Sequence, residues 1–301
     1  MNLYEELCSI AGEDHVLKDE PMSAHTTFRI GGPADYFVMP SEADEIGRIV
    51  ELCRGADVPY YIIGNGSNLL VGDKGYRGVI IQVYKNMDRI EVQGNEIRVQ
   101  AGALLSKTAA AACEAGLAGM EFASGIPGTL GGAVRMNAGA YGGEMKEILK
   151  SATLLTPDGE ILTLSVDEMK MGYRTSIVSK MDYVVLEARL ALTPGSRDEI
   201  RSRMNELKEK RVSKQPLEYG SAGSTFKRPE GYFAGKLIQD AGLRGFRVGN
   251  AQVSEKHCGF VINRGGATAK EVTELMDEVV RRVEENSGVR LEPEVKKIGE
   301  F

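Results

Sequence analysis

The chain has 301 residues, 42% of them hydrophobic and 27% charged, as in an ordinary globular protein large enough for two or three compact units. The net charge of -6 argues against broad electrostatic binding to nucleic acid, and no run approaches the roughly 18 apolar residues of a membrane span. The four cysteines and three histidines are scattered, which predicts no metal site and a soluble protein of the reducing cytoplasm.

The first 85 residues predict a small α/β unit. Short apolar runs predict strands over 36–39, 58–63 and 78–83. A helix is expected after the first strand, with Ser41 as its N-cap and Asp44 at position N3. We assign residues 1–85 to one subdomain.

From residue 86 to residue 195 the pattern changes to hairpins. Apolar residues alternate around Gly94-Asn95 in residues 90–99 and around Asp158-Gly159 in residues 151–164, which is typical of paired strands. An alanine-rich helix is predicted over 106–115 and a long strand over 183–192. Residues 86–195 form the second predicted subdomain.

The last hundred residues predict a further α+β unit. A charged helix is expected over 196–210, a strand over 259–262 and a helix from Thr268, where Glu271 completes a capping box. A final strand is predicted over 289–298. We assign residues 196–290 to a third domain and residues 291–301 to a strand that returns to the site.

Two glycine-rich segments carry the first functional signal. The strand ending at Ile63 runs into Gly64-Asn65-Gly66-Ser67-Asn68-Leu69, where glycine would let a phosphate approach the backbone N–H groups. The last glycine of a G-x-G-x-x-G motif is replaced by Leu69, which disfavours a Rossmann dinucleotide site. For this loop alone, a plain tight turn is an equally good interpretation.

The second glycine-rich segment covers residues 124–133 and continues over 137–143. It lacks the Lys-Ser/Thr of a P-loop, so nucleotide hydrolysis is disfavoured. Because so much glycine costs chain entropy and contributes little packing, we attribute it to an extended, phosphate-bearing ligand.

Two such loops, one in each of the first two subdomains, resemble the FAD-binding domain of vanillyl-alcohol oxidase and p-cresol methylhydroxylase relatives. Within that group the chain resembles the UDP-N-acetylenolpyruvoylglucosamine reductase (MurB) family. The matching segments follow the family's order and span nearly the whole chain: residues 26–34, the Gly64 loop, and residues 125–143, 173–176, 220–224 and 291–295. The fold class implied is α+β, with a two-subdomain FAD-binding domain and a C-terminal α+β substrate-binding domain.

The resemblance implies noncovalent FAD, NADPH as the hydride donor, and reduction of an enolpyruvyl ether to a lactyl ether in peptidoglycan precursor synthesis. No histidine lies between His25 and His257, and neither loop contains a cysteine, so the usual covalent flavin attachments are missing from the loops. The residues expected to bind FAD are Gly64, Asn65, Gly66, Ser67, Asn68, Leu69, Gly125, Ile126, Pro127, Gly128, Thr129, Gly131, Ala133, Asn137 and Gly139.

Three residues match the family's catalytic positions. Arg174 corresponds to the arginine that binds the substrate carboxylate, and Ser224 to the proton donor. Taken alone, they would be interpreted as a surface arginine and a turn serine. Glu294 corresponds to the group that stabilises the enolic intermediate, although alternation along a strand would place Glu292 on the same face.

The resemblance also assigns substrate binding to Tyr173, Lys214, Arg228 and His257. For His257, an ordinary core or surface histidine is the competing interpretation. Only 50 positions separate Arg174 from Ser224, which leaves no room for the tyrosine-bearing insertion of the longer family members. The chain therefore resembles the short subgroup, and what covers the substrate diphosphate stays open.

The expected partners are a UDP-sugar and NADPH, without nucleic acid or membrane, and the expected state is a monomer. One alternative is another flavin oxidoreductase of the same superfamily that acts on a hydroxy acid or alcohol. A second is a nucleotide-sugar binding protein without redox activity.

Overall fold

A computed structural model describes residues 2–301 of the chain. Its residues group into two compact units. Unit 1 contains residues up to 17, 36–65 and 79–211, and unit 2 contains residues 18–35, 66–78 and 212–301. Each compact unit is assembled from segments that alternate along the chain. The predicted boundaries at residues 85, 195 and 290 divide the chain into consecutive functional regions, and they stay a prediction.

The N-terminal part combines helices with a sheet of order β1-β2-β5-β3. Its elements are α1 (Leu3–Ala11), β1 (Val16–Pro21), β2 (Pro33–Val38), α2 (Ala43–Gly55), β3 (Tyr60–Ile63) and β5 (Tyr76–Gln82). Within unit 1, β3 pairs in parallel with the end of β5, Tyr60 opposite Val79 and Ile63 opposite Gln82. This pairing places the end of β3, and the Gly64 loop that follows, beside Gln82.

The predicted cap of α2 is wrong by one residue. Glu42, not Ser41, is the N-cap, and Glu45 therefore occupies N3 in place of Asp44. Ser41 instead donates its backbone N–H to Glu45 Oε2 at 2.7 Å. The longer glutamate side chain reaches back over the first turn, so the helix begins one residue later than the serine indicates.

Unit 1 also contains an antiparallel sheet of order β12-β11-β13-β7-β6. Its strands are β6 (Ile90–Gln93), β7 (Glu96–Gln100), β11 (Leu149–Leu155), β12 (Ile161–Ser165) and β13 (Val184–Ala191). Both predicted hairpins are confirmed, because Gln93 pairs with Glu96 and Leu155 with Ile161.

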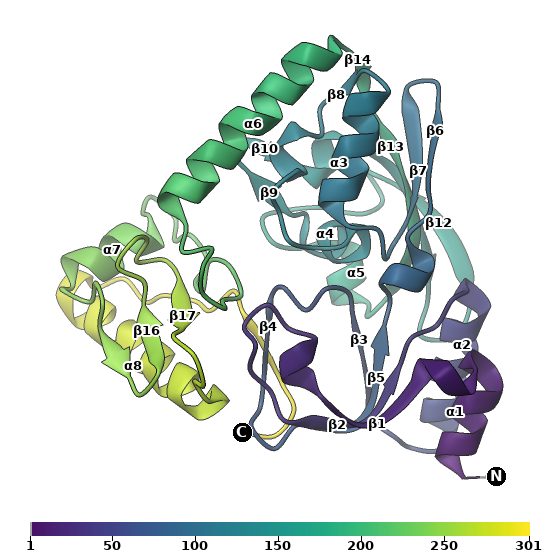
Figure 1. Cartoon of the computed structure of the whole chain (residues 1–301), viewed down its shortest axis with the longest axis horizontal. Helices are drawn as coiled ribbons and strands as arrows, with labels where there is room; N and C mark the ends of the chain where they lie inside the picture. The colour runs from purple at the N-terminus through teal and green to yellow at the C-terminus, as the bar shows by residue number, and fades with distance from the viewer. Residues whose placement is uncertain (1) are drawn as a thin grey trace. The chain divides into compact units, whose positions relative to one another are not determined.

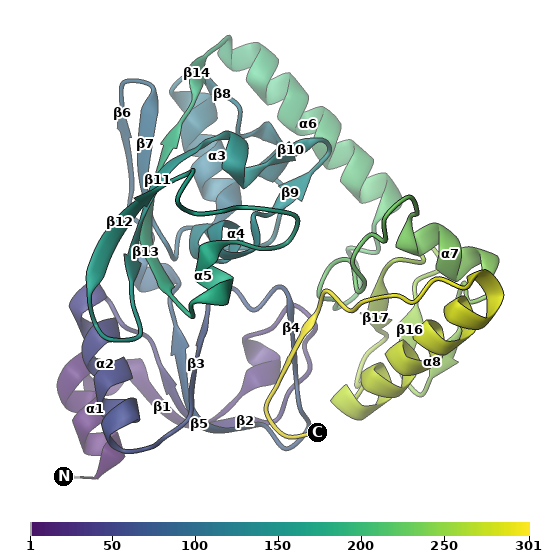
Figure 2. The same cartoon turned by 180° about the vertical axis from the view of Figure 1, so that it is seen from behind.

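Two helices, α3 (Leu105–Glu114) and α4 (Leu130–Met136), lie on the same side of this sheet in Figures 1 and 2. They cover a core formed by residues of unit 1. The remaining elements up to the unit boundary in α6 are β8 (Leu117–Ala118), β9 (Gly139–Ala140), β10 (Gly143–Glu144), α5 (Ile177–Lys180), β14 (Thr193–Pro194) and α6 (Arg197–Lys214).

Unit 2 has its own core, built around a small antiparallel sheet and two helices (Figure 1). The elements are β4 (Leu69–Val71), α7 (Ala234–Asp240), β15 (Arg247–Val248), β16 (Ala251–Val253), β17 (Val261–Asn263), α8 (Ala269–Ser287) and β18 (Lys296–Ile298). The predicted capping box of α8 is confirmed, with Thr268 and Glu271 bonded reciprocally.

The predicted strand over 289–298 is wrong for most of its length. Only Lys296–Ile298 forms a strand, β18, which pairs in parallel with β4. Residues before it make a single bridge, Phe226 opposite Pro293. The bridge does not extend into a ladder, because the Thr225 N–H donates to the Gly259 carbonyl and the Glu294 carbonyl accepts the Asn68 side chain.

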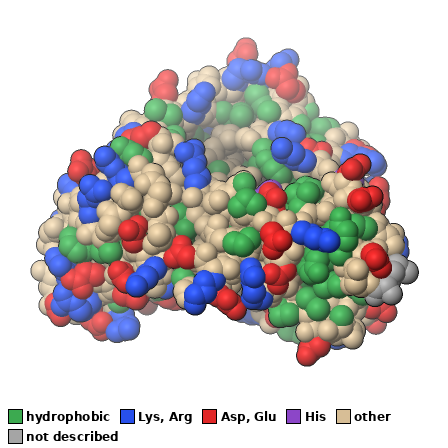
Figure 3. Space-filling model, turned by 60° about the horizontal axis from the view of Figure 1, so that its bottom comes forward, with side chains coloured by type: hydrophobic (Ala, Val, Ile, Leu, Met, Phe, Trp, Pro, Cys, Tyr) green, Lys and Arg blue, Asp and Glu red, His purple; other side chains and the backbone are tan. Residues whose placement is uncertain are grey.

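The surface is mixed in charge. Acidic and basic side chains are interspersed over the face shown in Figure 3, as expected for a chain with a small net charge. Across residues 2–301, each helix lacks the length or the apolar character needed to cross a bilayer. The same residues include no group of three or more His, Cys, Asp or Glu placed to hold a metal ion.

Candidate active site

The two glycine-rich loops meet in unit 1. Asn65 donates its side-chain N–H to the carbonyl of Pro127 at 2.6 Å, which joins the first loop to the second. A Cβ on Gly64 would lie 2.2 Å from Thr129 Oγ1, so only glycine permits this approach. Gln82, buried at the end of β5, donates to the Gly64 carbonyl at 3.3 Å. The structure thus brings together two segments that the sequence could only place separately.

The second loop is tied to the strand and helix beside it by its backbone. Leu130 and Gly131 donate their N–H groups to Ala103 and Ala101, each at 2.8 Å. A Cβ on Gly131 would lie 3.0 Å from the Ala101 Cβ, and one on Gly143 would lie 2.7 Å from the Phe122 ring. The sequence attributes the glycine density to a ligand, but close packing of the chain on itself accounts for Gly131 and Gly143.

The loop pair nevertheless suits a flavin dinucleotide. A Cβ on Gly132 would meet only Thr129 Oγ1 at 3.7 Å, so internal packing does not require this glycine, whereas Gly142 is required by its φ of +94°. Residues 64–69 and 124–133 contain no acidic side chain that would repel a diphosphate, and Asn and Thr side chains supply polar groups. Glycine backbone and these polar groups together fit FAD.

Arg174 stands on a tight turn in unit 1. Gly172 and Thr175 exchange backbone hydrogen bonds of 3.0 and 3.3 Å around Tyr173 and Arg174. Arg174 has φ +55°, a left-handed conformation that costs a non-glycine residue about 1–3 kcal/mol. Its guanidinium lies 5.1 Å from the centre of the Tyr173 ring, and that ring is 53% exposed. The predicted carboxylate-binding arginine is therefore held in a strained and specific backbone geometry.

Asn137 and Ser176 tie this turn to α4. Asn137, the left-handed C-cap of α4, donates its side-chain N–H to the Gly172 carbonyl at 3.1 Å. Ser176, fully buried, donates its hydroxyl to the carbonyl of Arg135 at 2.7 Å. Both sides of the turn are fixed to the helix that begins in the second glycine loop.

Ser224 and Glu294 come together in unit 2 although 70 positions separate them. Ser224 is exposed and follows Gly223, whose φ is +74°. The next residue, Thr225, is buried and accepts the Glu294 backbone N–H on its carbonyl at 2.8 Å. Thr225 also donates its own N–H to the Gly259 carbonyl at 2.9 Å, and its Oγ1 accepts the Val261 N–H at 2.8 Å. Three hydrogen bonds therefore fix the backbone beside Ser224.

The structure distinguishes the two glutamates that spacing alone left equivalent. Glu292 forms an ion pair with Lys227 and its side chain is 69% exposed. Glu294 is partly buried, its N–H is bonded to Thr225, and its carbonyl accepts the Asn68 side-chain N–H at 3.1 Å. Glu294 is thus the glutamate placed between the first glycine loop and the Ser224 segment within unit 2.

The part of the first loop in unit 2 is fixed by motif residues near the N-terminus. Thr27 donates its N–H to the Gly66 carbonyl at 3.3 Å. Gly66 has φ +59°, and a Cβ there would lie 2.0 Å from the His25 carbonyl oxygen. Glycine is obligatory at this position for both reasons.

The predicted substrate-binding residues of unit 2 have separate surroundings. The Arg228 guanidinium lies 4.0 Å from the centre of the Phe233 ring, Lys214 is the exposed last residue of α6, and His257 is partly buried. His257 Nδ1 accepts the Gly259 N–H at 3.0 Å, and its ring packs edge-on against Phe260. Burial lowers the pKa of His257, and the charges of Arg244 and Lys214 lower it further.

Sequence reasoning missed Thr225 and Arg211. Arg211 donates to the Gly125 carbonyl in the second glycine loop and lies over the Tyr141 ring, 5.7 Å from its centre. Burial lowers the pKa of its guanidinium. The sequence around Arg211 does not predict this contact. The one available signal is a basic residue near the end of a charged helix, which is a common feature and therefore a weak signal.

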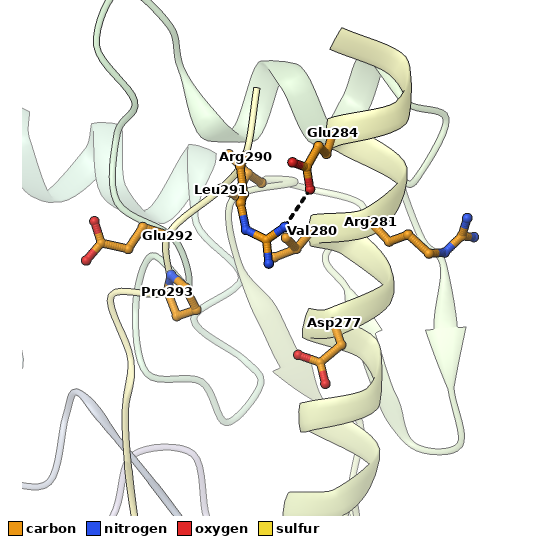
Figure 4. A pocket seen from close by; sticks show the side chains of 8 residues that line it. All are labelled: Asp277, Val280, Arg281, Glu284, Arg290, Leu291, Glu292 and Pro293. Atoms are coloured by element: carbon orange, nitrogen blue, oxygen red, sulfur yellow. Dashed lines mark hydrogen bonds and ion pairs between the residues drawn. The ribbon is translucent and has the colours of Figure 1, made fainter. Parts of the chain in front are cut away.

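A separate hollow of about 620 Å³ lies between α8 and residues 290–293 of unit 2. Figure 4 shows Arg290 reaching Glu284, a 2.8 Å ion pair, while Glu292 points away from α8. Its walls carry charges of both signs, and Ser224 and Glu294 are not among the residues that line it. The hollow is therefore distinct from the predicted catalytic residues.

Comparison with known proteins agrees with this arrangement. Residues 34–165 match the FAD binding domain family, and residues 215–298 match the C-terminal domain of UDP-N-acetylenolpyruvoylglucosamine reductase. The UDP-N-acetylenolpyruvoylglucosamine reductase of Agathobacter rectalis is 59% identical over 298 residues, covering 95% of each chain.

Two solved structures extend the comparison. The UDP-N-acetylenolpyruvylglucosamine reductase of Thermus caldophilus is 36% identical, with a TM-score of 0.80, and the match covers 94% of this chain and 98% of that one. The 4-ethylphenol oxidase of Gulosibacter chungangensis is 13% identical, with a TM-score of 0.51 over 97% of this chain and 64% of that one, a similarity of fold alone. The predicted fold class, an FAD-binding domain of the vanillyl-alcohol oxidase type followed by a C-terminal α+β domain, is confirmed.

Proposed function

We propose how the residues of this chain, which belongs to the UDP-N-acetylenolpyruvoylglucosamine reductase family, carry out the reaction of that family. The protein is an FAD-dependent oxidoreductase that reduces UDP-N-acetylglucosamine enolpyruvate to UDP-N-acetylmuramate in peptidoglycan precursor synthesis. The observation that carries this conclusion is the 59% identity over 95% of both chains. The joined glycine loops of unit 1 and the backbone hydrogen bond between Thr225 and Glu294 in unit 2 support it.

The reaction adds a hydride and a proton across the double bond of an enol ether. Bound FAD, once reduced by NADPH, supplies the hydride. The protein must bind the substrate carboxylate, stabilise the charge that develops on it as an enediolate, and deliver a proton to the α-carbon.

We assign the carboxylate to Arg174. A guanidinium presents a planar set of N–H donors that matches a carboxylate and remains charged at every relevant pH. The left-handed turn that carries Arg174 supports the assignment, because strain of this kind is retained where the surroundings fix a side chain for a task. Tyr173, half-exposed beside it, would contact the same ligand.

We assign proton delivery to Ser224 and stabilisation of the enediolate to Glu294. A serine hydroxyl is a weak acid, but an enediolate is a strong enough base to take its proton, and the Ser224 oxygen would recover a proton from solvent. The backbone hydrogen bond between Thr225 and Glu294 supports a joint role, because it holds the segment that carries Ser224 next to the segment that carries Glu294. Lys214, Arg228 and His257 are assigned to the nucleotide part of the substrate.

The cofactor is assigned to the two glycine loops. In unit 1, Gly64, Asn65, residues 125–129, Gly131, Ala133 and Gly139 would hold it; in unit 2, residues 66–69 would do so. The hydrogen bond from Asn65 to Pro127 supports this assignment, because it joins the two loops into one continuous surface. All four cysteines are free thiols, which supports a reducing, cytoplasmic setting; we further propose a monomer.

An anaerobic titration tests the proposal. The purified protein is expected to be yellow, to be bleached by NADPH, and to recover its absorbance when UDP-N-acetylglucosamine enolpyruvate is added. A protein that bleaches but does not recover with this substrate contradicts the substrate assignment and leaves the flavin intact. A colourless protein that still binds the UDP-sugar would identify a binding protein instead.

A further inference from the structure

We infer that Asn137 is a positioning residue that holds the Tyr173–Arg174 turn against the second glycine loop. It thereby couples the cofactor-binding helix α4 to the arginine assigned to the substrate carboxylate. The inference rests on the proposed function for the identity of the ligand, while the coupling itself is a property of unit 1.

The side-chain amide of Asn137 forms hydrogen bonds to three other residues of unit 1. Its Nδ2 donates to Glu144 Oε2 at 2.7 Å and to the Gly172 carbonyl at 3.1 Å, and its Oδ1 accepts the Lys146 N–H at 2.9 Å. The residue is 1% exposed. An amide has two N–H donors, and both are engaged, so this side chain has no donor left for FAD. Its predicted place among the cofactor ligands is better explained by positioning.

The acceptor Gly172 opens the turn that carries Arg174. Its carbonyl accepts both the Thr175 N–H, at 3.3 Å, and the Asn137 amide. Without the amide, one of two bonds that fix this carbonyl disappears, while Arg174 still has to adopt φ +55°. The strained conformation then competes with relaxed ones, and the guanidinium samples positions away from the carboxylate.

The simpler explanation is that Asn137 only ends α4. Asparagine is a common left-handed C-cap, and its φ of +45° fits that role. Glycine adopts the same conformation without cost, so replacing Asn137 with glycine preserves the helix end and removes only the side-chain bonds. This replacement separates the two explanations.

The test uses Asn137→Gly, with Asp57→Gly as its matched control. Asp57 is also left-handed, at φ +52°, and is exposed in unit 1. Two ligands are compared by titration of the holoenzyme: the enolpyruvyl substrate, and UDP-N-acetylglucosamine, which lacks the carboxylate. We expect Asn137→Gly to retain FAD and to weaken the carboxylate ligand about tenfold, the value of about one hydrogen bond, with little change for the other ligand.

A double-mutant cycle with Arg174→Ala completes the test. If Asn137 acts through Arg174, Asn137→Gly has no further effect on carboxylate binding once Arg174 is replaced. Equal weakening of both ligands, additive losses in the cycle, or loss of FAD from Asn137→Gly would overturn the inference.

Hydrogen exchange provides a readout that does not depend on the ligand. Exchange at residues 172–176 is expected to rise in Asn137→Gly and not in Asp57→Gly; unchanged protection would overturn the coupling. If wild-type protein fails to respond to the enolpyruvyl substrate, the proposed function fails, and the exchange result alone decides the coupling.

Discussion

The two units hold their candidate functional residues in different ways. In unit 1, side chains fix the backbone: Asn65 bonds to Pro127, Asn137 to Gly172, and Ser176 to Arg135. In unit 2, the backbone mainly bonds to itself: Thr225 pairs with Gly259 and Glu294, and Lys227 with Glu292. The first arrangement depends on the identity of each side chain, whereas the second would survive many substitutions.

The difference predicts how mutations should separate chemistry from structure. Removing Ser224 or Glu294 takes away a reactive group and leaves the backbone bonds around it intact. Changing Gly64 or Asn137 of unit 1 alters the scaffold itself. The following predictions test this contrast, beginning with the largest expected effect.

Ser224→Ala should reduce the rate at which substrate reoxidises the reduced flavin by about 10²–10⁴-fold, the usual contribution of a positioned proton donor. Bleaching by NADPH and the thermal midpoint should not change, because Thr225 still makes its three bonds. Stopped-flow absorbance measures both half-reactions, with Ser221→Ala as a control in the same motif. Equal loss in the two half-reactions would contradict the assigned role.

Glu294→Gln should slow the same half-reaction about a hundredfold, within the range for acid–base groups. Glu292→Gln is its matched control and should leave the rate within about twofold, because the Glu292–Lys227 pair is exposed and such pairs contribute little. Similar rates for the two variants would show that the difference in their surroundings does not matter for catalysis.

Gly64→Ala should destabilise unit 1 by about 1–3 kcal/mol, as overpacking does, because the added Cβ would overlap Thr129 Oγ1. FAD should dissociate more readily from this variant. Gly132→Ala, in the same contact region but with room for a methyl group, should leave the free energy of unfolding unchanged or slightly raised. Denaturant unfolding and flavin fluorescence measure the two effects; equal effects of the two variants would remove the case for tight loop contact.

His257 predicts a small pH effect in unit 2. Burial lowers the pKa of His257 in the folded protein below its usual value of about 6.5. At pH values between the folded and the unfolded pKa of His257, the unfolded chain binds more protons than the folded protein does. The free energy of unfolding therefore decreases as pH falls through the unfolded pKa. His257→Asn keeps an acceptor for the Gly259 N–H and does not titrate, so its unfolding free energy should depend less on pH between 7.5 and 5.5. An unchanged slope would show that His257 is not the group responsible.

Local features of the fold could be predicted from the sequence because neighbouring residues determine them. The turns Gly94-Asn95 and Asp158-Gly159 and the capping box Thr268–Glu271 are of this kind. The predicted Ser41 cap is wrong because Glu45, one residue beyond the expected N3 position, accepts the Ser41 N–H and occupies N3 of a helix capped by Glu42. The strand over 289–295 was wrong because alternation alone does not reveal which partner strand is available.

By itself, the sequence determined the glycine loops and the order of the motifs, since these are properties of short segments; the candidate catalytic residues follow from the family resemblance and stay a prediction. Only the tertiary structure decided that Gly64 faces Thr129, that Thr225 joins Ser224 to Glu294, and that Asn137 supports the turn of Arg174. These contacts join segments 35 to 69 positions apart. No local pattern encodes such pairings, because they are selected by the packing of each unit as a whole.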